Sequence, residues 1–182
     1  MKHIKLYESW LSEKKADTYS YGCAMLYFDL PEIKEIHLKI SNEDLYTESG
    51  NDGYGLETEP HVTLLYGIHS DEADDVDVFN ICEQHNYSGI TLHTVSAFKN
   101  EKFEVLKFEI EGNGLRECNR ELSEKLAFTN DYPDYHPHCT IAYLKPGTSD
   151  KYVEALKEIT YPVTPAKLVY SKPNGDKLAV DL

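Results

Sequence analysis

The chain is poor in basic residues. It has 18 Lys and Arg against 32 Asp and Glu, which gives a formal net charge of -14 over 182 residues. Proteins that hold a long nucleic acid draw most of their binding energy from Lys and Arg placed against backbone phosphates. We therefore expect no long nucleic acid among the partners, since a surface of this sign favours small substrates.

Long apolar runs and linker segments are also missing. No window approaches the ~20 apolar residues of a membrane span, and the first residues lack an apolar stretch of signal-peptide length. No low-complexity or Pro/Gly/Ser-rich tract divides the chain. We expect a cytoplasmic protein with no membrane partner, formed by a single domain over residues 19–182 and an N-terminal helix or arm over residues 1–18. Its oligomeric state is left open.

Cysteine is scarce and unpaired in sequence. The four cysteines include no Cys-x-x-Cys pair and lie inside apolar runs. This pattern is typical of buried free thiols in a reducing compartment rather than of disulfide bridges. The cysteines in question are Cys23, Cys82, Cys118 and Cys139.

What the chain does contain is a repeated heptapeptide. Residues 60–66 and 137–143 both read Pro-His-apolar-Thr-apolar-apolar-Tyr. Because side chains alternate along a strand, His and Thr two positions apart project from one face. Two such strands facing each other would place two imidazoles and two hydroxyls around one cleft. The same alternation predicts that Tyr66 and Tyr143 point to the reverse face and pack in the core.

This set of side chains suits a phosphodiester. Two histidines with pKa values near the operating pH can serve as general base and general acid. The candidates are His61 and His138, and either can take either role. Thr63 and Thr140 can hydrogen-bond the non-bridging phosphate oxygens, whose charge grows in the transition state. Such a reaction requires no metal and no other cofactor.

The remaining pattern indicates an α+β domain made of two similar halves. The apolar run over residues 21–30 predicts a buried strand. Amphipathic patterns that begin with acidic residues near Asp71 and after the glycines at 112 and 114 predict two helices. The Asn174-Gly175 turn predicts a C-terminal hairpin. A third helix is expected from Ser149 or Asp150, and a short one near Glu43 to Tyr46. The expected strands are Tyr21 to Leu30, the two motif strands, Ile90 to Phe98, Phe103 to Ile110, Lys167 to Tyr170 and Lys177 to Val180, with longer helices over Asp71 to His85 and after Gly114.

The two His-x-Thr motifs, each within an apolar strand, resemble the signature of the 2H phosphoesterase superfamily. That family includes 2′-5′ RNA ligase-like proteins, cyclic phosphodiesterases and phage nucleases that destroy cyclic-nucleotide immune signals. The resemblance implies a bilobal, pseudo-twofold fold with two antiparallel sheets around a central cleft and helices outside. It also implies metal-independent cleavage of small nucleotide or short oligonucleotide substrates. The likeness covers residue 20 onward and not residues 1–18.

Residues 55–67 look more like the phage and viral members of that family. If phage-encoded, the protein would be an anti-CBASS nuclease that acts on cyclic oligonucleotide signals in the host cytoplasm. RNA ends with 2′,3′-cyclic phosphates or 2′-5′ linkages are the other substrate class. Family members often add an aromatic or basic residue from the first strand and the C-terminal hairpin. The matching positions here are Tyr21, Lys167, Tyr170 and Lys172.

Two alternatives remain open. The first is a non-catalytic module that uses the same cleft to bind a nucleotide. The second is a metallohydrolase in which histidines converge on zinc. Its candidate ligands are His61, His136 and His138, with His85 and Cys82 as further candidates.

Overall fold

Two four-stranded antiparallel sheets form the framework of the protein. The computed structural model describes residues 21–69, 72–130 and 134–182, so the helix or arm predicted over residues 1–18 lies outside the described residues. Sheet A has the strand order β2-β1-β7-β8, and sheet B has the order β5-β4-β3-β6. The strands are β1 (Tyr21–Phe28), β2 (His61–His69), β3 (Ile90–Lys99), β4 (Glu104–Glu111), β5 (His138–Leu144), β6 (Tyr161–Val163), β7 (Pro165–Ser171) and β8 (Lys177–Asp181).

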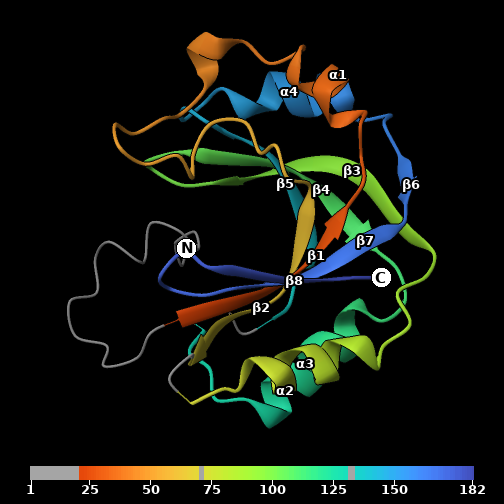
Figure 1. The fold of residues 1–182 in the computed structure, drawn as a ribbon. Helices are drawn as coiled ribbons and strands as arrows, with labels where there is room; N and C mark the ends of the chain where they lie inside the picture. The colour runs from red at the N-terminus through yellow and green to blue at the C-terminus, as the bar shows by residue number, and fades with distance from the viewer. Residues whose placement is uncertain (1–20, 70–71, 131–133) are drawn as a thin grey trace.

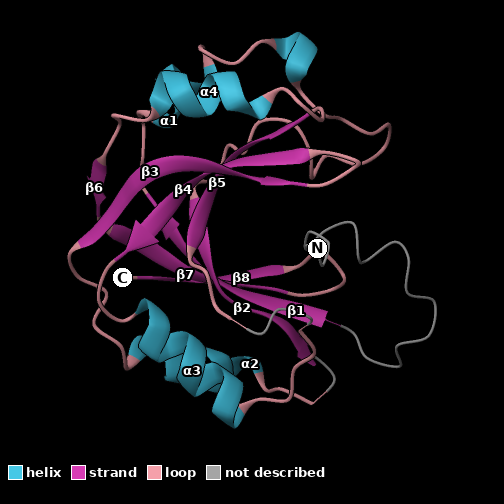
Figure 2. Ribbon diagram, turned by 180° about the vertical axis from the view of Figure 1, so that it is seen from behind, coloured by secondary structure: helices cyan, strands magenta, loops and turns pink. Residues whose placement is uncertain are grey.

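Helices cover the outside of each sheet (Figure 1). The helices α2 (Asp75–Glu83) and α3 (Leu115–Lys125) pack on sheet A, and α1 (Ile33–His37) and α4 (Ser149–Leu156) pack on sheet B. Figure 2 shows the same arrangement from behind, with both helix pairs at the periphery. We call the opposite, helix-free sides of the two sheets the inner faces. They turn toward each other.

The two motif strands meet at the centre of the molecule. β2 and β5 are each the edge strand of a different sheet, and they contact one another. Their outward-facing apolar side chains, such as Leu64 and Ile141, join one hydrophobic core that runs through both halves. The shared core fixes the two sheets relative to each other, as the predicted pseudo-twofold α+β fold requires.

Most predicted elements are confirmed, and two were missed. The structure adds α1, which has five residues after Pro31, and β6, which has three residues and contains Pro162. Neither is long enough to show a period in sequence. The short helix expected near Glu43 is a 3-10 turn over Asn42–Asp44.

The cysteines are free thiols, as predicted. Three are buried and Cys23 is partly exposed. The Sγ atoms of Cys82 and Cys118 lie 3.7 Å apart between α2 and α3. No helix in the described part of the chain is long and apolar enough to cross a membrane.

Candidate active site

Each motif strand carries an extra residue between its Thr and its Tyr. On β1, Met25 lies opposite Thr63 and Cys23 lies opposite Tyr66, so two steps on β1 match three steps on β2. The pairing of β5 with β4 shifts in the same way, between the partners of Thr140 and of Tyr143. At such a β-bulge the side chains before and after the extra residue no longer follow one continuous alternation between the two faces of the sheet.

The bulges bring both tyrosines onto the inner faces. Tyr143 packs with Tyr54 and Phe103 in a small aromatic cluster that is separate from the main core. The Tyr66 ring lies 6.4 Å from the ring of Tyr21. The prediction that Tyr66 and Tyr143 point to the reverse face is therefore wrong, because strict alternation does not survive an inserted residue. Tyr143 is nevertheless buried in a hydrophobic cluster, as predicted.

Polar groups from other elements hold the bulged backbone. The Asn119 side-chain amide of α3 donates to the Leu64 carbonyl at 2.7 Å, and the Tyr135 hydroxyl donates to the Thr63 carbonyl at 2.8 Å. In the other half, the Ile141 carbonyl accepts from the Glu57 amide at 3.0 Å. A ring nitrogen of His37, Nε2, lies 3.2 Å from the same carbonyl oxygen. Sequence reasoning did not find these supporting residues, because no local motif marks them.

The two motif histidines are oriented in the same way. His61 Nδ1 lies 2.7 Å from the Glu59 carbonyl, and His138 Nδ1 lies 2.9 Å from the His136 carbonyl. A carbonyl only accepts hydrogen bonds, so Nδ1 carries the proton in both rings. This assigns Nε2 of each neutral imidazole as the basic nitrogen, free of the backbone contact that fixes the ring.

The two motifs lie beside each other. The Cys139 thiol, between His138 and Thr140 in sequence, is hydrogen-bonded to the backbone of His61, and its burial raises its pKa to about 12. Protonated His61 is also near enough to help lower the pKa of His138. The structure thus brings the four predicted residues, His61, Thr63, His138 and Thr140, to the junction of the two inner faces.

An aromatic ring and two lysines surround His61. Tyr27, opposite His61 on β1, stacks on the imidazole with ring centroids 5.1 Å apart and an interplanar angle of 22°. The ammonium groups of Lys167 and Lys177 lie 5.1 Å and 5.6 Å from the centre of the Tyr27 ring. Lys177 also donates to Glu59 at 2.7 Å and to the Tyr27 hydroxyl at 3.1 Å. Burial raises the pKa of Tyr27 although Lys177 opposes that shift.

An ion pair with a buried lysine lies beside His138. Lys107 of β4 is 2 % exposed, forms an ion pair with Glu109 and donates to the Ser96 hydroxyl at 2.8 Å. The ring of Phe98 meets the His138 imidazole edge to face at 5.1 Å. Burial lowers the pKa of His138 to about 4, and the Lys107 cation adds to this shift, while the His136 carbonyl and Glu109 act against it.

With this geometry in place, comparisons with known proteins identify the family. A family model described as the 2′-5′ RNA ligase superfamily matches residues 31–172, well over half of the chain. The chain belongs to this superfamily. A search of curated protein sequences gives no match. Membership confirms the predicted 2H relationship and makes the protein a phosphoesterase, an enzyme that hydrolyses phosphodiester bonds.

Solved structures of Usb1 share the fold. The structure of Kluyveromyces marxianus Usb1 with uridine monophosphate has a TM-score of 0.57 at 8% identity, covering 89% of this chain and 98% of that one. A second Usb1 structure from the same organism has a TM-score of 0.52 at 9% identity, with the same coverage. The MHV ns2 PDE domain is matched at a TM-score of 0.45 and 13% identity, covering 84% of this chain and 98% of that one. The Usb1 likeness confirms the predicted 2H fold.

Of the further substrate-binding positions predicted for this superfamily member, two lie on the inner face and two do not. Tyr21 is in contact with Tyr66, and Lys167 reaches the ring of Tyr27.

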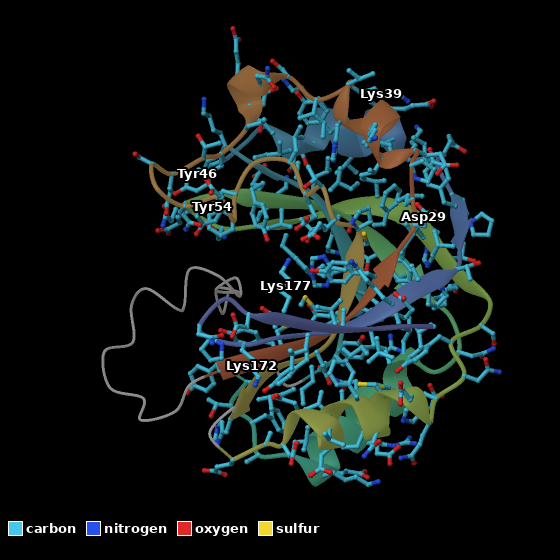
Figure 3. All side chains as sticks on the ribbon, in the orientation of Figure 1. Asp29, Lys39, Tyr46, Tyr54, Lys172 and Lys177 are labelled. Atoms are coloured by element: carbon cyan, nitrogen blue, oxygen red, sulfur yellow. The ribbon has the colours of Figure 1, made fainter. Side chains whose placement is uncertain are left out.

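Tyr170 is fully buried on the reverse face, opposite Ala24. Lys172 forms an ion pair with Asp75 of α2 at 2.5 Å. Figure 3 shows Lys177 between the sheets and Lys172 on the helix side of sheet A.

Tyr170 and Lys172 therefore leave the candidate site for a physical reason. Along β7 the inner-face positions are Lys167, Val169 and Ser171, since these pair with the inner-face residues of β1. Tyr170 and Lys172 have the opposite parity. Lys177 was missed, although the hairpin that carries it to the inner face was predicted.

The residues considered for zinc do not converge. Cys82 contacts Cys118 between the two helices outside sheet A, and His85 lies 2.8 Å from the carboxylate of Glu121. Among the residues that the structure describes, no group of three or more His, Cys, Asp or Glu side chains is arranged to hold a metal ion. Cys82 and His85 instead belong to the packing of α2 on α3.

Proposed function

We propose that the protein cleaves phosphodiester bonds in small nucleotide substrates by acid-base catalysis with His61 and His138. The observation that carries this proposal is the matched pair of imidazoles, each with Nδ1 fixed by a backbone carbonyl two residues earlier. In both rings Nε2 is the nitrogen left to exchange a proton with a substrate. Thr63 and Thr140 lie on the same inner faces as these rings.

The chemistry needs one neutral and one protonated imidazole. The neutral ring takes the proton of the attacking hydroxyl, either a substrate 2′-OH or a water, as that oxygen bonds to phosphorus. The bond from phosphorus to the leaving oxygen breaks, and the protonated ring gives its proton to that oxygen. Each proton transfer is typically worth ~10²–10⁴ in rate. The Thr63 and Thr140 hydroxyls donate to the non-bridging oxygens, and no resident metal takes part.

The charge distribution favours a small nucleotide. The chain as a whole carries a net charge of -14, which opposes binding of a long polyanion. The positive groups Lys167 and Lys177 instead gather around Tyr27, beside His61. Aromatic faces stack on nucleobases, and ammonium groups attract phosphates. The Usb1 structure that contains uridine monophosphate supports a nucleotide ligand for this fold.

Within this class, cyclic oligonucleotide signals are the substrates we favour, and a phage protein that degrades such immune signals is the corresponding biological role. RNA ends with 2′,3′-cyclic phosphates or 2′-5′ linkages are the second class. Incubation with cyclic di- and trinucleotides, 2′,3′-cyclic mononucleotides and short 2′-5′ RNA, followed by chromatography of the products, separates them. Turnover of the cyclic oligonucleotides at the highest kcat/KM supports the first class; preference for RNA ends replaces it with the second.

The same assay decides between the enzyme and its two alternatives. Tight binding of a nucleotide without turnover would identify a non-catalytic binding module and overturn the proposal. Loss of activity after exhaustive chelation, restored by zinc, would identify a metallohydrolase. Activity that is unchanged by chelation and lost in His61→Ala or His138→Ala is the expected result.

The lysines beside Tyr27 are proposed to contact substrate phosphate. Lys167→Met should raise KM for every substrate of the set, because it removes a cation near the aromatic face of Tyr27. Lys172→Met is the matched control, since it removes the same charge from the same hairpin but on the helix side of sheet A. Equal KM values for the two variants would remove Lys167 from the site.

A further inference from the structure

The two halves agree at the motifs but differ on the neighbouring strand. In sheet B, Lys107 of β4 lies opposite Thr140. The equivalent place in sheet A, opposite Thr63, is occupied by Met25. Met25 belongs to a small apolar cluster with Tyr27 and Val169. The residue opposite the motif threonine is therefore apolar in sheet A and a buried ammonium in sheet B.

A buried ammonium is costly unless its hydrogen bonds are made. Lys107 meets this requirement through a closed set of contacts. Its Nζ donates to Ser96 Oγ at 2.8 Å and to the Glu109 carboxylate, and Ser96 Oγ donates to the same carboxylate at 2.6 Å. Nζ also lies 4.3 Å from the centre of the Phe98 ring. These contacts fix the position of the positive charge.

The same residues form the wall of the His138 side chain. Glu109 lies opposite His138 in the sheet, and Phe98 contacts the imidazole edge to face. The charged or titratable groups that act on this ring are Lys107 and Glu109 from β4 and His61 from β2. Glu109 accepts from both Lys107 and Ser96, so its negative charge is already engaged. A second positive charge on His138 is disfavoured in this position.

His61 lies in a different setting, with the ammonium groups of Lys167 and Lys177 around the Tyr27 ring that stacks on it. The face of the Tyr27 ring stacks on its imidazole, and aromatic faces attract cations. The Glu59 carboxylate is close enough for protonated His61 to help lower its pKa, although the hydrogen bond from Lys177 is the larger cause. His61 is therefore the ring left to serve as the acid.

We propose that Lys107, held by Glu109 and Ser96, is a positioning residue that acts together with the packing around the ring to keep His138 uncharged, and so makes His138 the general base and His61 the general acid. This inference rests on the proposed function and assigns its two roles. His138 Nε2 takes the proton of the attacking hydroxyl while that oxygen bonds to phosphorus. The leaving oxygen takes its bonding electron pair from phosphorus and the proton from His61 Nε2. Solvent then returns the proton from His138 to His61.

The test compares Lys107→Met with Lys172→Met. The first variant gives sheet B the residue that sheet A has at the equivalent place, and the second removes the same charge from the helix side of sheet A. Two readouts are used: the acidic limb of the kcat/KM profile against pH, and the titration of His138 followed by NMR in the free protein. The NMR readout needs no substrate, so failure of the proposed function leaves this inference testable.

Removing the cation should move the His138 midpoint from about 4 to higher pH. We expect a rise of the midpoint in Lys107→Met, in both readouts, and no change in Lys172→Met. Glu109→Gln has nearly the same shape but removes the negative charge instead, so its midpoint should stay at or below that of the wild type. It also serves if Lys107→Met fails to fold.

Three results would overturn the inference. One is a His138 midpoint unmoved in Lys107→Met. Another is a rise in Glu109→Gln, which would mean that loss of structure rather than loss of charge moves the titration. The third is an acidic limb of activity that follows the titration of His61 instead of His138, which would exchange the two roles.

Discussion

The bulge in β2 makes a prediction that joins stability to activity. Asn119 of α3 donates a hydrogen bond of 2.7 Å to the Leu64 carbonyl, at the point where the strand leaves simple alternation. Asn119→Ala removes the donor and leaves this carbonyl without its side-chain partner. Thr63 directly precedes the bulge, so the change should also affect the position of its hydroxyl.

The size of the effect follows from two opposing terms. An unmade hydrogen bond at a carbonyl removed from water costs about 1–3 kcal/mol. Alanine is the better helix former, which returns up to ~0.7 kcal/mol. Asn80→Ala in α2 measures the second term alone, because Asn80 is an exposed residue of a neighbouring helix. The free energy of unfolding of Asn119→Ala should thus lie about 1–3 kcal/mol below that of Asn80→Ala.

Urea denaturation of both variants gives the two free energies, and each kcal/mol should also lower Tm by about 2–4 °C. In the activity assay, kcat should fall in Asn119→Ala and stay at the wild-type value in Asn80→Ala. Equal stability of the two variants would refute the reasoning that Asn119 supports the bulge. A stability loss with unchanged kcat would show that the bulge does not position Thr63.

Two further predictions test the same strand. Gly67→Ala should destabilise the protein by roughly 3 kcal/mol or more in thermal unfolding, because its φ is +81° and a Cβ would lie 1.9 Å from a backbone oxygen. The control is Gly175→Ala, at φ +89° with open space around it, which should cost only about 1–2 kcal/mol. Similar losses for both variants would argue against the close contact at Gly67. Leu65→Ala should lower the free energy of unfolding by about 2–5 kcal/mol, because it truncates a core side chain. Tyr66→Ala should mainly reduce kcat/KM, because Tyr66 lies on the inner face. The reverse pattern would show that Tyr66 packs in the core instead.

The sequence predicted the motif pairs because they depend only on strand alternation over three residues. His61 with Thr63, and His138 with Thr140, need no information from elsewhere in the chain to share a face. The relation between the two copies also predicted a fold with similar halves. These inferences depend on local rules, which explains why they hold.

The bulges were not predictable in the same way. The residues Leu64 and Ile141 look like ordinary strand positions, and the donors that support the extra residue come from α3 and from the loop before β2. An inserted residue reverses the parity of everything that follows it. The error for Tyr66 and Tyr143 is therefore one error made twice.

The positions of Lys107 and Glu109 were not predicted, for a related reason. In β4 both faces are largely buried, and apolar and charged residues occur on each of them. The sequence therefore does not show which face of this strand is the inner one. A hydrophobic cluster that includes Phe103 and Val105 covers one end of the inner face. Only the register with β5 shows that Lys107 and Glu109 lie beside the second motif.

The central claim is that His61 and His138 act on one phosphate as a pair, and a double-mutant cycle tests it most directly. With the favoured nucleotide substrate, kcat/KM is measured for the wild type, His61→Ala, His138→Ala and the double variant. We predict that each single change lowers the rate about 10²–10⁴-fold, and that the double variant is little worse than either one, since each histidine acts only with the other. Independent losses that multiply in the double variant, or near-wild-type activity of either single variant, would contradict the account.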